Sequence, residues 1–242
     1  WSSDVCSSDL ILSFDHYPVT TDGVRDDYFE NLELAAQAAA DRGLPLWAFV
    51  LAVAHRPYPI PTAEHLRFQA LCNLAYGATC IQYFTYWTPF PGTWDFHQGP
   101  IETDGSVTPT YGLVQAVNRR ISELGPIFAA ARPVRIGHLG DPLPRGTRAY
   151  EPRDDGPTVR LESGRVLVSH LQGEHDDWCA VVNRDLERPA GVAFIAAEGR
   201  DHVDVTAPAS PVAAVPGEAC IIPPADLRIW RWRRAEIGRA HV

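Results

Sequence analysis

The sequence contains no lysine and no methionine, so each of its 21 basic residues is an arginine. Thirty acidic residues give a formal net charge of −9. This charge argues against nucleic acid or an anionic membrane as the main partner, because both select basic patches. No apolar run approaches the about 18 residues that a membrane-spanning helix needs. The chain has the composition of an ordinary globular protein, with 45% hydrophobic and 21% charged residues.

Cysteine is scarce and its spacing excludes a familiar class of metal site. The five cysteines form no CxxC pair and no cluster with histidine at zinc-ligand spacing, so we expect no metal and no cofactor. Cys72 and Cys80 lie in apolar stretches and are predicted to be buried thiols. Cys179 and Cys220 lie in two predicted strands, and they could form a disulfide if those strands are neighbours.

Three apolar strands alternate with three helices in residues 11–131. The strands are predicted at 11–18, 45–53 and 78–87, and the helices at 28–43, 61–77 and 108–125. Gly125 and Pro126 should end the third helix. This alternation is typical of parallel βα units, and near-continuous apolar strands fit a sheet that is buried on both faces.

The second part of the chain has a different texture. Residues 132–158 are rich in proline, glycine and arginine, which predicts a linker and connecting loop. Residues 159–235 contain seven short strands separated by turns, which predicts an antiparallel β-sandwich. The fold class is therefore α/β followed by all-β. Trp178, Trp230 and Trp232 are predicted to pack inside the sandwich.

Polar side chains gather where the first three strands end. Asp15, His16 and Tyr17 follow the first strand, and His55 and Arg56 follow the second. Tyr86 and Trp87 close the third. In barrels and open α/β sheets this carboxyl edge carries the functional site.

These segments resemble a known enzyme family. DHYP, PLWAFVLAVAH, LAYGATCIQYFTYW and TPTYGLVQAVNRRISELGP are similar to the last part of a β-galactosidase-like clan A glycoside hydrolase barrel. The module that contains VVNRDLERP and VPGEACIIPP is similar to the β-sandwich that follows such barrels. The resemblance covers residues 11–235. It implies that residues 11–131 are the sixth to eighth units of a (β/α)8 TIM barrel whose parent protein is secreted or periplasmic.

The resemblance also implies a reaction, the hydrolysis of O-glycosidic bonds in a β-galactoside-like or related saccharide. Retaining glycosidases need two carboxyl groups about 5–5.5 Å apart. In this family the acid/base follows the fourth strand, and the nucleophile is a glutamate at the end of the seventh. Residues 45–63 contain no carboxylate, and Leu51 stands where the nucleophile is expected. The acids that could substitute are Asp15, Asp95, Glu102 and Asp104.

The missing carboxylate keeps two other functions open. The first is a carbohydrate-binding or scaffolding relative that has lost catalysis. The second is a metal-dependent barrel hydrolase that would use Asp15, His16 and His55 as ligands. An additional His-x-His motif in an earlier strand would support this hypothesis.

The expected substrate-binding residues are Asp15, His16, Tyr17, His55, Arg56, Tyr83 and Trp87. The indole of Trp87 would stack on a sugar ring, and Tyr83 lies an even number of residues away and should share its face. Tyr86 should face the other way, into the core. Asp15 could instead cap the turn before Pro18, and Arg56 could pair with a structural acid.

The two ends of the chain are predicted to be non-biological sequence. DVCSSDL and IGRAHV can be encoded by the two strands of one short DNA sequence, which we identify as a common sequencing adapter. We therefore expect residues 1–10 and 236–242 to be translated adapter. Cys6 would then have no functional role.

Overall fold

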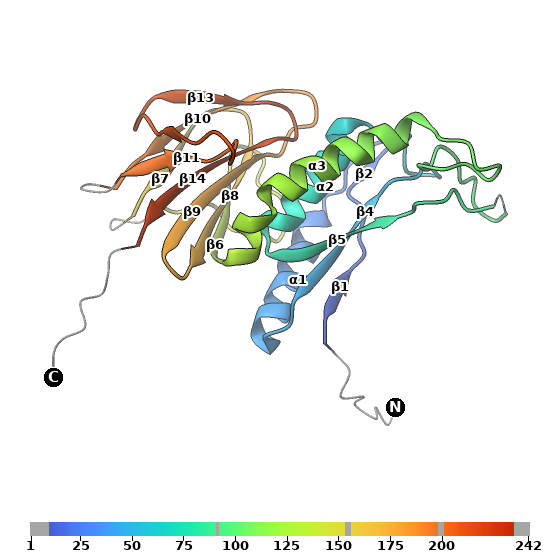
Figure 1. Cartoon of the computed structure of the whole chain (residues 1–242), viewed down its shortest axis with the longest axis horizontal. Coiled ribbons are helices and arrows are strands. Elements are labelled where there is room, and N and C mark those ends of the chain that lie inside the picture. Colours follow the sequence, from blue (N-terminus) through green and yellow to red (C-terminus); the bar gives the residue numbers. More distant parts are fainter. Residues whose placement is uncertain (1–9, 91, 153–155, 198–200, 235–242) are drawn as a thin grey trace.

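A computed structural model describes residues 10–90, 92–152, 156–197 and 201–234. A parallel sheet with three helices lies beside two antiparallel sheets, and the long helix α3 extends across the junction (Figure 1). The two segments expected to be adapter, Cys6 included, lie outside the described residues except for Leu10. Within the described part, no helix combines the length and the hydropathy of a membrane span.

The first half confirms the predicted alternation of strands and helices. Its strands are β1 (Leu12–Phe14), β4 (Leu46–Leu51) and β5 (Ala78–Phe84), and its helices are α1 (Tyr28–Arg42), α2 (Ala63–Ala75) and α3 (Pro109–Ala130). The strands form one parallel sheet in the order β1-β4-β5. A short hairpin of β2 (Val19–Thr20) and β3 (Gly23–Val24) lies between β1 and α1.

Two helix ends agree with the sequence and one does not. α1 ends at Gly43, whose φ of 65° is left-handed and accessible to glycine without strain. The side chain of Thr62 accepts a hydrogen bond from the backbone N–H of His65 and caps α2. The expected stop at residue 125 is wrong, because α3 continues through Pro126 to Ala130. Burial of Ile127 and Phe128 in the core offsets the cost of about 3 kcal/mol of an internal proline.

The second half is an antiparallel sandwich of two sheets. Its strands are β6 (Ala131–Leu139), β7 (Thr158–Ser163), β8 (Val166–Gly173), β9 (Asp176–Asn183), β10 (Ala190–Ile195), β11 (His202–Asp204), β12 (Val212–Ala213), β13 (Ala219–Ile222) and β14 (Leu227–Arg233). One sheet has the order β12-β11-β14-β9-β8-β6 and the other the order β13-β10-β7.

The predicted linker at 132–158 is wrong in its first part. β6 follows α3 directly and pairs with β8 along most of its length. Proline and arginine in residues 131–139 obscured this strand, but an edge strand tolerates proline because one side of it makes no ladder hydrogen bonds. The connecting segment is therefore confined to residues 140–157.

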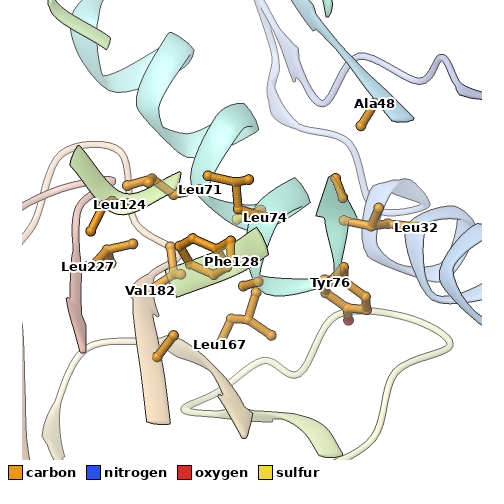
Figure 2. Close-up of a cluster of buried hydrophobic side chains, with 14 of the residues drawn as sticks. Leu32, Ala48, Leu71, Leu74, Tyr76, Leu124, Phe128, Leu167, Val182 and Leu227 are labelled. Atoms are coloured by element: carbon orange, nitrogen blue, oxygen red, sulfur yellow. The ribbon is translucent and has the colours of Figure 1, made fainter. Parts of the chain in front are cut away.

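The six-stranded sheet is covered on both faces. On one face Leu167, Val182 and Leu227 belong to the same cluster as residues of α2 and α3. Figure 2 shows these three side chains close to Leu71, Leu74, Leu124 and Phe128. On the other face Val168, Val181 and Trp230 pack with residues of the three-stranded antiparallel sheet. The barrel part and the sandwich therefore share one hydrophobic core.

Buried polar contacts reinforce this junction. The Ser169 hydroxyl donates to the carbonyl of Ala75 at 2.7 Å. The Tyr76 hydroxyl and the His138 Nε2 atom lie 2.9 Å apart in a buried hydrogen bond. These bonds join α2 and the residue after it to β8 and β6, so residue 131 does not divide two independent cores.

The cysteine and tryptophan predictions have mixed outcomes. Cys179 in β9 and Cys220 in β13 lie in different sheets, and both are free thiols, so the considered disulfide is absent. Cys72 is buried as predicted, whereas Cys80 is half-buried. The tryptophans predicted to pack in the sandwich are all buried, as expected: Trp178, Trp230 and Trp232.

Candidate functional site

The two faces of β4 meet different surroundings. Ala48 and Val50 are fully buried and pack in clusters with the helices. Trp47 and Phe49 alternate with them and remain half-buried. Because side chains alternate along a strand, these two point to the opposite face, which corresponds to the interior of a barrel. The candidate site lies where this face meets the carboxyl ends of the strands.

The loops that follow β4 and β5 are held together by backbone hydrogen bonds. Ala54 and His97 exchange two N–H···O bonds of 2.9 and 3.0 Å. The backbone N–H of Arg56 also donates to the Asp95 Oδ1 atom at 2.9 Å. Residues 54–56 and 94–97 therefore form one unit at the carboxyl edge of the sheet, which we call the loop clamp.

His55 forms the centre of the loop clamp. It is 8% exposed, and its ring centroid lies 4.6 Å from Phe96, 4.9 Å from Tyr58 and 5.9 Å from Trp94. Burial lowers the pKa of the imidazole, which keeps it neutral at physiological pH. His55 therefore packs against the aromatic rings and supports Trp94 edge-on.

Four aromatic side chains in the segment that follows β5 are exposed. The exposed fractions are 63% for Tyr86, 45% for Trp87, 75% for Phe90 and 55% for Trp94. Large apolar rings at the surface mark interaction sites more often than isolated aliphatic residues do. The prediction that Tyr86 is a core residue is wrong. β5 ends at Phe84, so the strand alternation on which that prediction depended does not reach residue 86.

Tyr83 does not join this group. Its hydroxyl donates to the Asn118 Oδ1 atom of α3 at 2.9 Å, and its ring packs with residues of α2 and α3. The expectation that Tyr83 shares the face of Trp87 is therefore wrong for the same reason as the Tyr86 prediction. Tyr83 connects β5 to the helix layer.

The three residues after β1 divide into two groups. His16 Nε2 lies 3.1 Å from Asp27 Oδ1, and the ring stacks on Tyr28. The side chains of Arg25 and His16 hold the pKa of Asp27 down to about 2. Tyr17 instead lies edge-on to Tyr58, and burial together with its hydrogen bond to Asp15 raises its pKa. Tyr17 thus packs on Tyr58, the neighbour of His55, while His16 stabilises the start of α1.

The position expected for a catalytic glutamate is closed. Leu51 is 5% exposed, and its backbone N–H donates to the Gln69 Oε1 atom of α2 at 2.9 Å. A carboxylate here would replace a side chain that the fold buries. The catalytic role suggested by the resemblance therefore needs an acid from another element.

The loop acids differ in what they bind. Glu102 accepts from the backbone N–H of Gln98 at 2.8 Å, and Asp104 accepts from that of Ser106 at 2.9 Å, so both stabilise their own loop. In the described part of the chain, Asp95 is the one of these three acids that forms a hydrogen bond with the loop after β4. That bond lowers the pKa of Asp95, whose side chain is 53% exposed. No local sequence pattern reveals this contact, because it joins residues 39 positions apart.

Arg56 lies near an acid, as the interpretation of this residue as a structural ion-pair partner predicted. Its guanidinium Nε atom lies 3.9 Å from Asp95 Oδ2, and its side chain is 93% exposed. An ion pair with this exposure stabilises the fold little, which leaves the guanidinium accessible. Within the described ranges, no group of three or more His, Cys, Asp or Glu side chains could hold a metal ion.

Comparisons with known proteins point to the fold. No family model and no curated protein matches the sequence. A catalytic mutant of a GH42 β-galactosidase from G. stearothermophilus has a TM-score of 0.57 and 10% identity, covering 93% of this chain and 60% of its own. An α-amylase from Geobacillus thermoleovorans has 0.45 and 12%, covering 87% and 44%, and a GH27 β-L-arabinopyranosidase from G. stearothermophilus has 0.40 and 11%, covering 89% and 43%.

Of these three scores, the first exceeds 0.5, and at this identity it bears on the fold alone. This chain spans about 60% of the length of that β-galactosidase. The parallel sheet with its helices and the separate antiparallel sheets are accordingly a partial TIM barrel followed by a β-sandwich.

Proposed function

We propose that this chain is the C-terminal part of a glycoside hydrolase and that the loop clamp binds the saccharide. The observation that carries the proposal is the exposed indole of Trp94 next to the carboxylate of Asp95, in a segment at the carboxyl edge of the sheet that also exposes Tyr86, Trp87 and Phe90. Carbohydrates present apolar C–H faces that suit aromatic rings and hydroxyl groups that suit carboxylates. A β-galactoside-like saccharide is the substrate class that the family resemblance favours.

Trp94 and Asp95 would contribute most to binding. The indole of Trp94 is held by His55 on one side and is exposed on the other, so a sugar ring can stack on it without displacing protein contacts. The adjacent carboxylate of Asp95 keeps acceptor capacity beyond the Arg56 N–H bond, because two carboxylate oxygens provide about four acceptor positions. Trp87 would provide a second stacking surface.

Hydrolysis would need a second carboxyl group. Asp95 is our candidate for the carboxylate that replaces the glutamate absent at Leu51, since the fold brings it to the loop after β4. Its partner would have to lie about 5–5.5 Å away for a retaining mechanism or about 6.5–9.5 Å away for an inverting one. Asp15 is the other acid at this edge, and its hydrogen bond to Tyr17 gives it a structural role.

The closed position of Leu51 favours one alternative, a carbohydrate-binding relative without catalysis. Both functions predict that the 242-residue chain binds sugar. They differ in whether the full-length parent protein also hydrolyses it. The hydrolase hypothesis predicts turnover of nitrophenyl galactosides by that protein and a loss of at least 100-fold in Asp95→Asn. Sugar binding without turnover of any nitrophenyl glycoside in a panel would establish the alternative instead.

Binding itself is testable by titrating the chain with lactose or galactotriose in a calorimeter. We expect Trp94→Ala and Asp95→Asn each to weaken binding about tenfold, consistent with the loss of one stacking or charged hydrogen-bond contact. Asp104→Asn is the matched control, because Asp104 is an exposed acid in the same loop that also accepts a backbone N–H bond. Equal affinity in the wild type, Trp94→Ala and Asp95→Asn would refute the assignment.

A further inference from the structure

The backbone of Gln98 has a conformation that is unfavourable for a residue with a side chain. Its φ of 55° lies in the left-handed region, where a Cβ atom crowds the backbone and glycine is the usual residue. Gln98 directly follows His97, so it is the residue at which the chain leaves the loop clamp. Strained backbone of this kind concentrates at functional sites, where the surrounding structure holds it in place.

Two side chains hold the backbone of Gln98 directly. Its N–H donates to the Glu102 Oε1 atom at 2.8 Å. Its carbonyl accepts a hydrogen bond from the Thr110 hydroxyl, in the first turn of α3, at 2.9 Å. Both backbone polar groups of Gln98 are therefore bonded to parts of the chain outside the loop clamp, and these bonds fix its left-handed conformation.

The residues on either side of Gln98 are held as well. His97 exchanges two backbone hydrogen bonds with Ala54. Gly99 donates its N–H to the Thr88 hydroxyl at 3.0 Å, and a Cβ atom at Gly99 would lie 2.6 Å from that oxygen, so this position requires glycine. The sequence thus has glycine where space demands it and glutamine at the neighbouring position, where the backbone favours glycine.

A comparison with Ala225 shows what can offset such strain. Among the described residues, Gln98 and Ala225 are the two non-glycine positions with positive φ. Ala225 has a φ of 53°, and its fully buried methyl group belongs to the core that the helices share with the sandwich. The side chain of Gln98 is half-buried, and its amide forms no hydrogen bond with another described residue. Core packing offsets the strain at Ala225, whereas no polar contact of the amide does so at Gln98.

We infer that Gln98 is a further sugar-contacting residue beside the loop clamp and that its amide binds a hydroxyl group of the saccharide. This inference rests on the proposed function. An amide can bind a sugar hydroxyl as a donor or as an acceptor, whereas the ionised carboxylate of Asp95 can only accept. Because the backbone of Gln98 is fixed on both sides, the amide is presented from a rigid support.

The test measures sugar affinity and stability in the same variants of the 242-residue chain, with lactose titrated in a calorimeter and unfolding followed in urea. Gln98→Ala removes the amide and keeps the left-handed strain. Its affinity should fall about fivefold, as expected for the loss of one hydrogen bond, and its urea midpoint should stay the same. Gln98→Gly removes the amide and the strain, so its affinity should fall equally while its midpoint stays the same or rises.

Ala225→Gly is the matched control, because it relieves the same strain within the sandwich and should leave the affinity unchanged. Unchanged affinity in Gln98→Ala, with weaker binding in Trp94→Ala, would overturn the inference and leave the proposed function intact. A loss of affinity in Gln98→Gly alone would also overturn it, because the backbone and not the amide would then control binding. So would a lower urea midpoint in Gln98→Ala, which would give the amide a structural role. No lactose binding by the wild type would refute the proposed function and this inference together.

Discussion

The two large sheets of this molecule differ in how completely they are covered. In the six-stranded sheet, Leu167 and Val168 point to opposite faces and both are fully buried, one against the helices and the other inside the sandwich. In the parallel sheet, Val50 is fully buried, whereas its neighbour Phe49 is only half-buried. Both faces of the six-stranded antiparallel sheet are therefore covered within this chain, whereas one face of the parallel sheet remains partly open.

This difference explains why the barrel part and the sandwich form one unit. The three helices bury one face of the parallel sheet and also cover the six-stranded sheet, so the helix layer serves both. Three βα units would have little core by themselves. The shared cluster supplies the apolar burial that the open inner face lacks.

The largest expected effect comes from the shared core. Leu167→Ala should destabilise the protein by about 3–4 kcal/mol, because it removes a fully buried side chain between β8 and the helices. Urea unfolding followed by tryptophan fluorescence and by far-ultraviolet circular dichroism should give coincident transitions in both proteins. Leu34→Ala, at an exposed position on α1, should change the stability by less than about 0.5 kcal/mol. Separate transitions for the helices and the sandwich would contradict the shared core.

The next effect depends on pH and on the junction between β6 and α2. Burial lowers the pKa of His138 to about 3, while the unfolded chain has an ordinary histidine pKa of about 6.5. Between these values the unfolded state binds a proton that the folded state excludes. Stability is thus fully present above pH 6.5 and falls by up to about 1.4 kcal/mol per pH unit as the pH drops toward 3.

His138→Asn should reduce this slope in urea titrations at pH 7, 6 and 5. His175→Asn is the control, because His175 is 81% exposed and should leave the slope intact. An unchanged slope in His138→Asn would show that another group controls the acid sensitivity of the junction.

The smallest effect separates the two faces of β4. Val50→Ala should cost about 2 kcal/mol, since Val50 is fully buried against α2 and α3. Phe49→Ala removes a larger side chain but should cost about 1 kcal/mol or less, because its face is partly open. Chemical denaturation of both variants measures the difference. A cost for Phe49→Ala that exceeds that of Val50→Ala would mean that the inner face is already covered.

Most of the fold follows from local patterns in the sequence. Apolar strands alternating with capped helices predicted the parallel sheet, and the turn-rich second half predicted seven of the nine strands of the sandwich. The errors at α3 and β6 share a cause. Pro126 and Pro133 indicate breaks locally, but the burial of Phe128 and the pairing of β6 with β8 outweigh that preference.

The candidate site was less predictable. His55, Arg56 and Trp87 lie at the expected edge, because the carboxyl ends of parallel strands converge. The roles of Tyr83 and Tyr86 depended on where β5 ends, and a period-two pattern in an aromatic run does not mark that end. The contact of Asp95 with Arg56 comes from loop packing over a long sequence separation, for which one sequence contains no signal.

The most direct test of the proposed function is hydrogen–deuterium exchange of the 242-residue chain with and without a galactose-terminated oligosaccharide. The proposal predicts slower exchange in residues 54–58 and 94–97, with no change in the strands of the sandwich. The same sugar should leave exchange unaltered in Trp94→Ala. Protection confined to the sandwich, or no protection at saturating sugar, would contradict the loop clamp as a carbohydrate site.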